Sequence, residues 1–344
     1  MSEHDNAVLP ARIAANPYSG EIAIEVRDLV KTYPGPGGGA PVQALDQLSI
    51  RVAAGTIFGL LGPNGAGKST TIKILTTLSR PDSGDVRVAG IDVIDHPDWV
   101  RREIGLVSQK ASSDPMATGR ENLLLAARIQ GLSRRTAATR ADELIDRFGL
   151  TDAAHRLART YSGGMARRLD VAIGLVHGPQ VLFLDEPTTG LDPEARAEMW
   201  AEIERLADER TTVLLTTHYL EEADRLADRL AIVDRGRVVI EGTAEDLKRE
   251  LHGDAVTVEL GSAAQLATAV ARLRVMPELR EISSDGTSLR ARADTGSTAV
   301  PAVLASLDEA GVTVASITVS RPSLDDVYLR HAGRSYHATE ENSR

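Results

Sequence analysis

A glycine-rich segment of nine residues constrains the fold of this chain more than any other feature. It matches the pattern Gly-x4-Gly-Lys-Ser/Thr and reads Gly62-Pro63-Asn64-Gly65-Ala66-Gly67-Lys68-Ser69-Thr70. An apolar run at residues 57–61 precedes it and a helical pattern at residues 71–75 follows, so the segment joins a strand to a helix. Glycines let backbone N–H groups turn toward a polyphosphate, and the start of a helix adds its positive dipole end. The segment therefore predicts a phosphate-binding loop (P-loop) in an α/β fold that binds a nucleoside triphosphate.

A second motif predicts how the triphosphate is handled. The apolar run at residues 181–184 ends in Asp185-Glu186, so a buried strand delivers two carboxylates to one edge of a sheet. Asp185 can hold Mg²⁺ together with the Ser69 hydroxyl, while Lys68 supplies a charge for the β- and γ-phosphates. Glu186 points elsewhere and can orient a water near the γ-phosphate as a general base. These residues predict hydrolysis of the triphosphate with Mg²⁺ as cofactor.

Another glycine-rich helix start lies in the middle of the chain. Ser162-Gly163-Gly164 is preceded by Tyr161 and followed by Met165 and apolar residues at helical spacing. Ser162 is therefore predicted to cap a helix whose first N–H groups are left uncovered by the two glycines. Ser-Gly-Gly alone is usually a turn. Beside a P-loop it suggests a symmetric dimer, in which this segment of one chain closes on the nucleotide that the other chain holds.

Strands and helical segments alternate between residues 21 and 251, which predicts an α/β domain. The wholly apolar runs at residues 181–184 and 213–215 are typical of parallel strands covered on both faces. Residues 22–26 alternate as an edge strand does. The stretch from about residue 114 to residue 178 is almost entirely helical in pattern. We therefore expect a helical subdomain inserted into the α/β domain.

The two ends of the chain have patterns of their own. Between about residues 254 and 330, strands and helices follow the order β-α-β-β-α-β, with a hairpin at Asp285-Gly286. That order predicts a small ferredoxin-like α+β domain over residues 252–334. Residues 1–20 are predicted to be a disordered N-terminal arm and residues 335–344 a flexible tail.

Composition limits the classes of partner. The 344 residues carry a net charge of −10, which argues against a broad basic face for nucleic acid. The chain has no cysteine, so disulfides and thiolate metal sites are excluded. Residues 1–20 lack the apolar core of a signal peptide, and no apolar stretch approaches the roughly 20 residues that span a bilayer. We therefore expect any attachment to a membrane to be made through a partner.

With these motifs in this order, the chain resembles the ATP-binding cassette (ABC) ATPases over roughly residues 21–251. The resemblance implies ATP as the nucleotide and identifies Ser162-Gly163-Gly164 as the signature segment, which binds ATP in trans. It implies that Gln109, after an apolar strand, touches Mg²⁺ and senses a transmembrane partner. It also implies that His218 is the switch histidine, which contacts the γ-phosphate while Glu186 positions water.

Two further residues match the family, and two depart from it. By resemblance, Tyr33 stacks on the adenine base and Asp192 belongs to the D-loop. The family's signature usually reads Leu-Ser-Gly-Gly-Gln, whereas Tyr161 and Met165 flank the Ser-Gly-Gly of this chain. Met165 puts in doubt any hydrogen bond that a glutamine makes across the dimer.

The variant signature is similar to that of the daunorubicin/doxorubicin-resistance exporter ATPases. That branch also tends to carry a small C-terminal domain ending in a motif like residues 322–329 of this chain. The resemblance implies an ATPase subunit that forms a homodimer on binding ATP and powers an exporter of drugs, lipids or other hydrophobic compounds. Its implied partner is a separate integral membrane permease, and its implied place is peripheral, at the cytoplasmic face of the cell membrane.

Other members of the family remain as alternatives. The ATPase of a sugar importer is expected to carry an all-β extension, whereas this tail alternates helix and strand. A ribosome-acting ABC protein usually has two cassettes, and this chain has a single P-loop. A DNA-repair ATPase of this type splits its cassette with a long coiled coil or zinc modules, which this sequence lacks. An importer ATPase or a non-transport ABC ATPase is therefore the alternative function.

Overall fold

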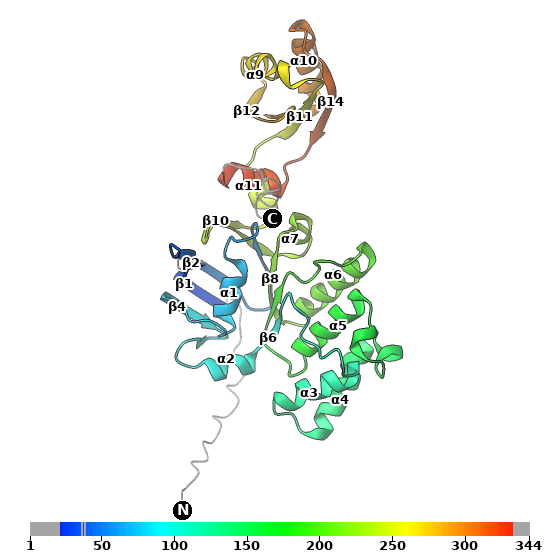
Figure 1. Ribbon diagram of the computed structural model, residues 1–344. Helices are drawn as coiled ribbons and strands as arrows, with labels where there is room; N and C mark the ends of the chain where they lie inside the picture. The colour runs from blue at the N-terminus through cyan, green and yellow to red at the C-terminus, as the bar shows by residue number, and fades with distance from the viewer. Residues whose placement is uncertain (1–20, 36, 38, 333–344) are drawn as a thin grey trace, which may run out of the picture.

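The computed structural model describes residues 21–35, 37 and 39–332. The predicted N-terminal arm at residues 1–20 and the tail at residues 335–344 lie outside these described residues. Figure 1 shows a large lobe of sheets and helices, with a smaller lobe standing beyond it. No helix formed by the described residues is both long enough and apolar enough to cross a membrane.

A six-stranded sheet runs through the large lobe in the order β10-β9-β3-β8-β7-β6. Neighbouring strands are parallel except for β10, which pairs antiparallel with β9. The strands are β3 (Ile57–Leu61), β6 (Ile104–Val107), β7 (Val181–Asp185), β8 (Thr212–Thr217), β9 (Arg229–Asp234) and β10 (Arg237–Gly242). Every residue of β3, β7 and β8 is buried, which confirms the prediction of covered parallel strands. The carboxyl ends of these strands meet at one edge of the sheet.

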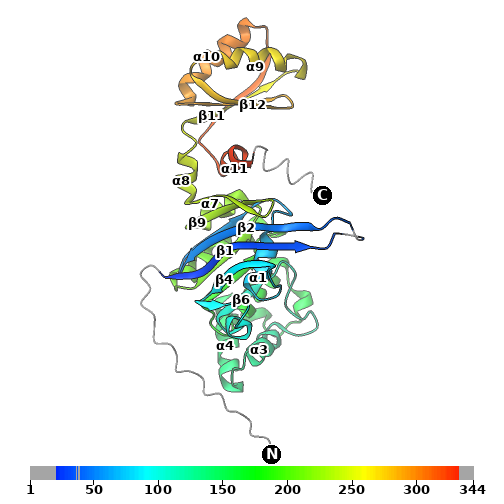
Figure 2. The same cartoon turned by 90° about the vertical axis from the view of Figure 1, so that its left-hand side faces the viewer.

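A second, antiparallel sheet has the order β2-β1-β4-β5 and lies beside the first, as Figure 2 shows. Its strands are β1 (Ile22–Tyr33), β2 (Val42–Ala53), β4 (Ser83–Val88) and β5 (Ile91–Asp92). The prediction of an edge strand at residues 22–26 is wrong, because β1 pairs with β2 on one side and β4 on the other. Apolar–polar alternation reports one covered face of a strand and says nothing about its edges, so it cannot separate the two cases.

Helices pack on the six-stranded sheet, and the predicted helical stretch forms a cluster at one side (Figure 1). Helices α3 (Gly119–Ile129), α4 (Arg134–Arg147) and α5 (Gly163–Gly174) make up this cluster. Thr118 and Glu121 form the expected capping box at the start of α3. The other helices of the large lobe are α1 (Lys68–Leu75), α2 (Pro97–Glu103), α6 (Pro193–Asp208), α7 (Leu220–Leu226) and α8 (Ala244–Arg249).

The small lobe has the predicted β-α-β-β-α-β order and an antiparallel sheet, β12-β13-β11-β14. Its elements are β11 (Asp254–Leu260), α9 (Leu266–Arg274), β12 (Leu279–Asp285), β13 (Ser288–Ala293), α10 (Gly296–Glu309) and β14 (Val314–Ser320). Apolar side chains on one face of the sheet, such as Val256, Val258 and Leu289, pack with Leu273 and Val303 of the two helices. This arrangement is the ferredoxin-like fold that the sequence predicts.

One helix of the C-terminal region packs on the large lobe. Helix α11 (Leu324–Ala332) follows the last strand of the small lobe and lies between the two lobes in both views (Figures 1 and 2). Its buried Val327 and Tyr328 belong to the same apolar cluster as Leu61 of β3 and Leu230 of β9. The Tyr328 hydroxyl lies 3.4 Å from Asp234 Oδ1. Helical periodicity shows which face of α11 is apolar, but not that this face meets the large lobe.

Candidate functional site

The P-loop leaves the carboxyl end of β3 and enters α1, as the sequence predicts. Gly65 and Gly67 have φ angles of +79° and +112°, which glycine adopts without strain. A Cβ atom on Gly67 would approach Ala44 O to 2.7 Å, and one on Gly62 would approach Val233 O to 2.3 Å. Backbone curvature and close packing therefore both require glycine in this loop.

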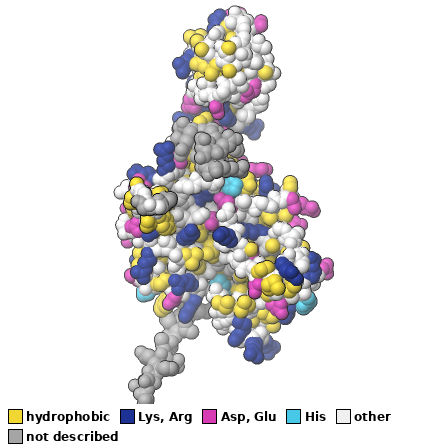
Figure 3. Space-filling view, in the orientation of Figure 1, with side chains coloured by type: hydrophobic (Ala, Val, Ile, Leu, Met, Phe, Trp, Pro, Cys, Tyr) yellow, Lys and Arg dark blue, Asp and Glu magenta, His cyan; other side chains and the backbone are white. Residues whose placement is uncertain are grey.

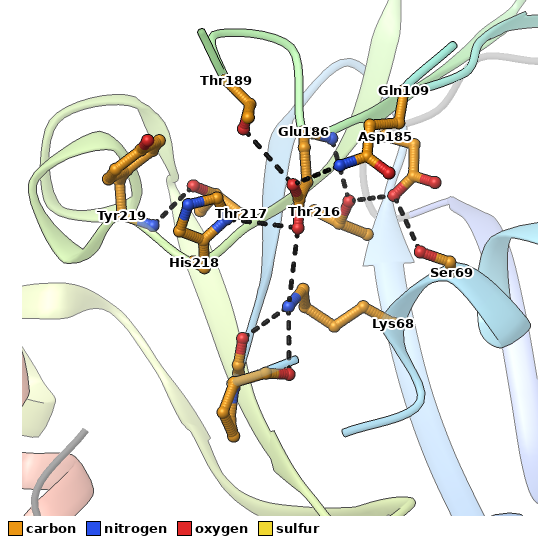
Figure 4. Close-up of polar contacts among 12 residues, drawn as sticks. Lys68, Ser69, Gln109, Asp185, Glu186, Thr189, Thr216, Thr217, His218 and Tyr219 are labelled. Carbon is orange, nitrogen blue, oxygen red and sulfur yellow. Dashed lines mark hydrogen bonds and ion pairs between the residues drawn. The ribbon is translucent and has the colours of Figure 1, made fainter. Parts of the chain in front are cut away.

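Lys68 lies folded over the P-loop at the start of α1. Its side chain is 5 % exposed, and its Nζ donates to Gly62 O at 2.5 Å and Pro63 O at 3.2 Å. The same Nζ lies 3.9 Å from Glu186 Oε1. The amine thus stands between the phosphate-binding loop and the acidic end of β7, as Figure 4 shows.

Two of the predicted metal ligands meet beside the P-loop. Ser69 Oγ donates to Asp185 Oδ1 at 3.3 Å, and Thr216 Oγ1 donates to the same oxygen at 2.6 Å. Hydroxyl and carboxylate oxygens are the ligands that Mg²⁺ prefers, so this pair fits the ion. The third predicted ligand, Gln109, contacts a different carboxylate: its Nε2 donates to Glu186 Oε2 at 3.1 Å.

Glu186 has a backbone conformation that is rare for its residue type. Its φ angle is +48°, in the left-handed region that disfavours side chains with a Cβ atom. Its N–H donates to both the carbonyl oxygen and Oγ1 of Thr216 at 3.1 Å. Such conformations persist where the surroundings over-determine them and are common at functional sites. The turn aims the carboxylate at the group of polar side chains drawn in Figure 4.

The Glu186 carboxylate is almost enclosed by donors. His218 Nδ1 lies 3.2 Å from Oε1, and Thr189 Oγ1 donates to Oε2 at 3.3 Å. Burial by itself raises the pKa of Glu186, but the hydrogen bond and charge of His218, the charge of Lys68 and the hydrogen bond from Thr189 outweigh it and lower the pKa. The group is therefore a carboxylate at neutral pH and can accept a proton.

Three predicted site residues make their contacts outside this group. Ser162 caps α5 as expected, since its Oγ accepts from Met165 N at 3.3 Å. Asp192 caps α6, where its Oδ1 accepts from Ala195 N at 2.8 Å. Tyr33 ends β1, and Lys31 Nζ lies 5.4 Å from the centroid of its ring. The functional roles of these three residues stay predictions.

Sequence reasoning missed several residues that support the site. Thr216 contacts both acids at the end of β7, and Thr189 contacts Glu186. Arg167 and Asp170 of α5 contact the backbone on both sides of Gln109. A polar residue at the end of an apolar strand, as at Thr216, is a usable signal. A buried arginine inside a helix gives none until the fold is known.

The chain is similar to known proteins over almost all of its length. The ABC transporter family model matches residues 45–189. The daunorubicin resistance ATP-binding protein DrrA3 of Streptomyces coeruleorubidus is 49% identical over 291 residues, which are 85% of this chain and 92% of that protein. The chain belongs to the ATP-binding proteins of ABC transporters. A second family model, for the C-terminal domain of DrrA1-3-like ATP-binding proteins, matches residues 242–332 of this ABC ATPase.

Two other comparisons agree with this assignment. The daunorubicin/doxorubicin resistance ATP-binding protein DrrA of Streptomyces peucetius is 49% identical over 312 residues, 90% of this chain and 92% of that protein. A solved dimeric ATP-binding cassette in a post-hydrolysis state, bound to ADP and Pi, superposes with a TM-score of 0.59 at 26% identity, covering 64% of this chain and 98% of that one. The predicted family and branch are confirmed, and the protein is an ATPase that binds ATP.

Proposed function

We propose that this ABC ATPase is the ATP-hydrolysing subunit of an exporter of drugs, lipids or other hydrophobic compounds. The observation that carries the catalytic part is the Glu186 carboxylate, ionised and held at the edge of the sheet beside Lys68, His218 and Asp185. The export direction and antibiotic resistance are supported by relatives named for resistance to daunorubicin and doxorubicin.

The residues of the P-loop, from Gly62 to Thr70, bind the phosphates of ATP in this proposal. Ser69 and Asp185 would hold Mg²⁺, which would neutralise charge on the β- and γ-phosphates, and Gln109 would be a further ligand. Tyr33 stacks on adenine. These assignments are supported by the 3.3 Å contact of Ser69 with Asp185 and by the glycine geometry of the loop.

The charges around Glu186 suggest how the base becomes active. Lys68 and His218 lower its pKa. Both are groups that a γ-phosphate would attract. Once they turn to the phosphate, Glu186 loses their stabilisation and its pKa rises, which makes it a stronger base toward water. His218 then contacts the γ-phosphate while Glu186 takes the proton.

A second copy of the chain completes each site in this proposal. Ser162, Gly163 and Gly164 start α5, and a Cβ atom added to Gly163 would meet nothing within 4 Å. Free N–H groups at such a helix start suit a phosphate. The signature segment of one chain closes over the ATP held by the other, with Asp192 at the D-loop between them. The dimeric solved cassette supports this arrangement.

The transport partner is a separate integral membrane permease, which places the ATPase peripherally at the cytoplasmic face of the membrane. The ferredoxin-like small lobe argues against a sugar-importer ATPase, whose extension is expected to be all-β. Basic and acidic side chains are interspersed on the face drawn in Figure 3, and the net charge is −10, so nucleic acid is not proposed as a partner.

Affinity purification from membranes of the native cell tests the proposal. We expect a polytopic membrane protein to co-purify with this ATPase. We also expect daunorubicin to stimulate ATP hydrolysis by the purified complex. Co-purification of ribosomes or DNA in place of a membrane protein would contradict it.

A further inference from the structure

Arg167 is a buried residue for which the function described above has no role. It lies on α5, five residues after Ser162, and is 9 % exposed. Its guanidinium donates to four backbone carbonyl groups: Nε to Pro187 O at 2.8 Å, Nη1 to Ser108 O at 2.7 Å, and Nη2 to Asp185 O at 3.0 Å and Glu186 O at 3.2 Å. None of these bonds is local in sequence.

Three of the four carbonyls belong to the turn that carries the proposed base. Asp185, Glu186 and Pro187 are consecutive, and the middle residue has the left-handed φ of +48°. A backbone in that region is held only by its surroundings. Arg167 holds it from the side of α5, while Thr216 holds it from the side of β8 through the Glu186 N–H.

The fourth carbonyl, that of Ser108, directly precedes Gln109. One helical turn after Arg167, Asp170 accepts from Ser112 N and Ser113 N, both at 3.0 Å. Helix α5 therefore holds both ends of the loop that contains Gln109. Because Gln109 Nε2 in turn donates to Glu186 Oε2, the loop, the helix and the base form one connected unit.

We propose, on the basis of the dimer described above, that Arg167 is a positioning residue that couples the signature segment to Glu186 and Gln109 of its own chain. In a head-to-tail dimer, the start of α5 touches the ATP held by the partner, while Glu186 lies beside the ATP held by the P-loop of its own chain. A shift of α5 on ATP capture moves the carbonyls at Glu186 and Ser108 with it. Arg167 thereby links the two ATP sites of the dimer.

Guanidinium chemistry suits this task. Its planar fork has five N–H donors in fixed geometry, so one side chain can hold several carbonyls in a set relation. A lysine has a compact ammonium that cannot span the same carbonyls, and a glutamine has one amide group. Arg168, the next residue, provides a matched control: it donates to Phe148 O at 3.2 Å, and Glu198 is its ion-pair partner at 3.7 Å.

Steady-state kinetics and ATP binding of the full-length chain test the coupling. We expect Arg167→Gln to bind ATP with a Kd within about twofold of the native value but to lose about 100-fold in kcat, because small displacements of a catalytic group cost that much. The Hill coefficient for ATP hydrolysis should fall toward one. Arg167→Lys should recover little of the kcat, and Arg168→Gln should keep both the kcat and the Hill coefficient.

Several results would overturn the inference. The inference is wrong if Arg167→Gln keeps the native kcat and Hill coefficient. It is also wrong if both Arg167→Gln and Arg167→Lys lose ATP binding, because the residue would then be a requirement of folding. The dimer itself is checked separately with Glu186→Gln and ATP. A missing dimer there contradicts the proposed function, whereas unchanged kinetics of Arg167→Gln in a protein whose Glu186→Gln variant dimerises contradict the coupling alone.

Discussion

The Nδ1 atom of His218 lies 3.2 Å from Oε1 of Glu186. This contact joins the residue after β8 to the residue after β7, two neighbouring parallel strands. Because strands of this kind end at the same edge of the sheet, two short sequence motifs about thirty residues apart place a carboxylate and an imidazole side by side. The Glu186 carboxylate is also contacted by Gln109 and Thr189.

The lowered pKa of Glu186 predicts an acid-side loss of stability. The folded pKa lies below the ordinary value of 4.5, so the ionised carboxylate stabilises the fold above that pH, and this contribution is lost as the pH falls through the folded pKa. We expect the difference in unfolding free energy between the native chain and Glu186→Gln to shrink as the pH falls below the ordinary value of 4.5. Urea titrations without nucleotide measure it. A constant difference over that range would contradict the assigned shift.

Thr216 is expected to matter for turnover more than its small side chain suggests. Thr216→Val removes the donor to Asp185 Oδ1 at 2.6 Å and one acceptor of the Glu186 N–H. The cost in stability is about 1–3 kcal/mol for buried groups left unsatisfied. We expect kcat to fall at least about tenfold, since both acids lose a positioning contact.

Thr212 at the other end of β8 supplies the control for that measurement. It is equally buried, and its Oγ1 accepts from Gly55 N at 2.9 Å, far along the strand from the acids. Thr212→Val should lose stability in the same range and keep its kcat. An equal loss of kcat in both variants would show that Thr216 acts through stability alone.

Substitutions at Gly163 and Gly164 distinguish contacts within one chain from contacts across the proposed dimer. A Cβ atom on Gly163 meets nothing within 4 Å, whereas one on Gly164 lies 2.9 Å from the Ala195 Cβ. Gly163→Ala should therefore leave ATP binding by the monomer unchanged. Its melting temperature should stay the same or rise slightly, because alanine favours helix. It should still reduce hydrolysis if that surface faces the partner's ATP. Normal hydrolysis in Gly163→Ala would contradict the dimer contact.

Helix α11 is expected to stabilise the large lobe. Tyr328 is fully buried in the cluster that contains Leu61, directly before the P-loop. Tyr328→Ala should lower the unfolding free energy by about 3–5 kcal/mol, the usual cost of deleting a buried ring. The half-exposed Leu304 of α10 is the control, and Leu304→Ala should cost less than about 1 kcal/mol. Equal stabilities of the two variants would show that α11 is not docked.

A deletion starting at residue 252 should have a related effect. It removes α11 along with the ferredoxin-like sheet and uncovers Leu61, Leu230 and Leu247 of the large lobe. We expect the truncated chain to keep nucleotide binding but to melt at a lower temperature and to assemble poorly with the proposed permease. Calorimetry and ATP titration of the truncated chain measure the first two effects.

The sequence predicts a site residue well where its position depends only on neighbouring segments of the chain. The P-loop needs only a strand, glycines and a helix in succession, and Asp185-Glu186 needs only a strand end. The order of elements in the small lobe follows from alternation and one Asp-Gly turn. These features depend on neighbours in the chain, which periodicity reports directly.

Other features depend on which surfaces meet in space. The inner position of β1, the docking of α11 and the four carbonyl bonds of Arg167 join segments far apart in sequence. An arginine among apolar helical residues has the same pattern whether its guanidinium faces solvent or a buried turn. Only the assembled fold distinguishes the two.

Gel filtration of Glu186→Gln with and without ATP tests the central claim most directly. The variant keeps the P-loop and its N–H groups, so it should bind ATP, but it lacks the carboxylate that we propose accepts a proton from water. With ATP and Mg²⁺ we expect it to elute as a dimer that does not hydrolyse its nucleotide, and without ATP as a monomer. Lys68→Ala, which loses the amine beside the phosphates, should stay monomeric in both cases. A Glu186→Gln variant that binds ATP yet elutes as a monomer would contradict the account.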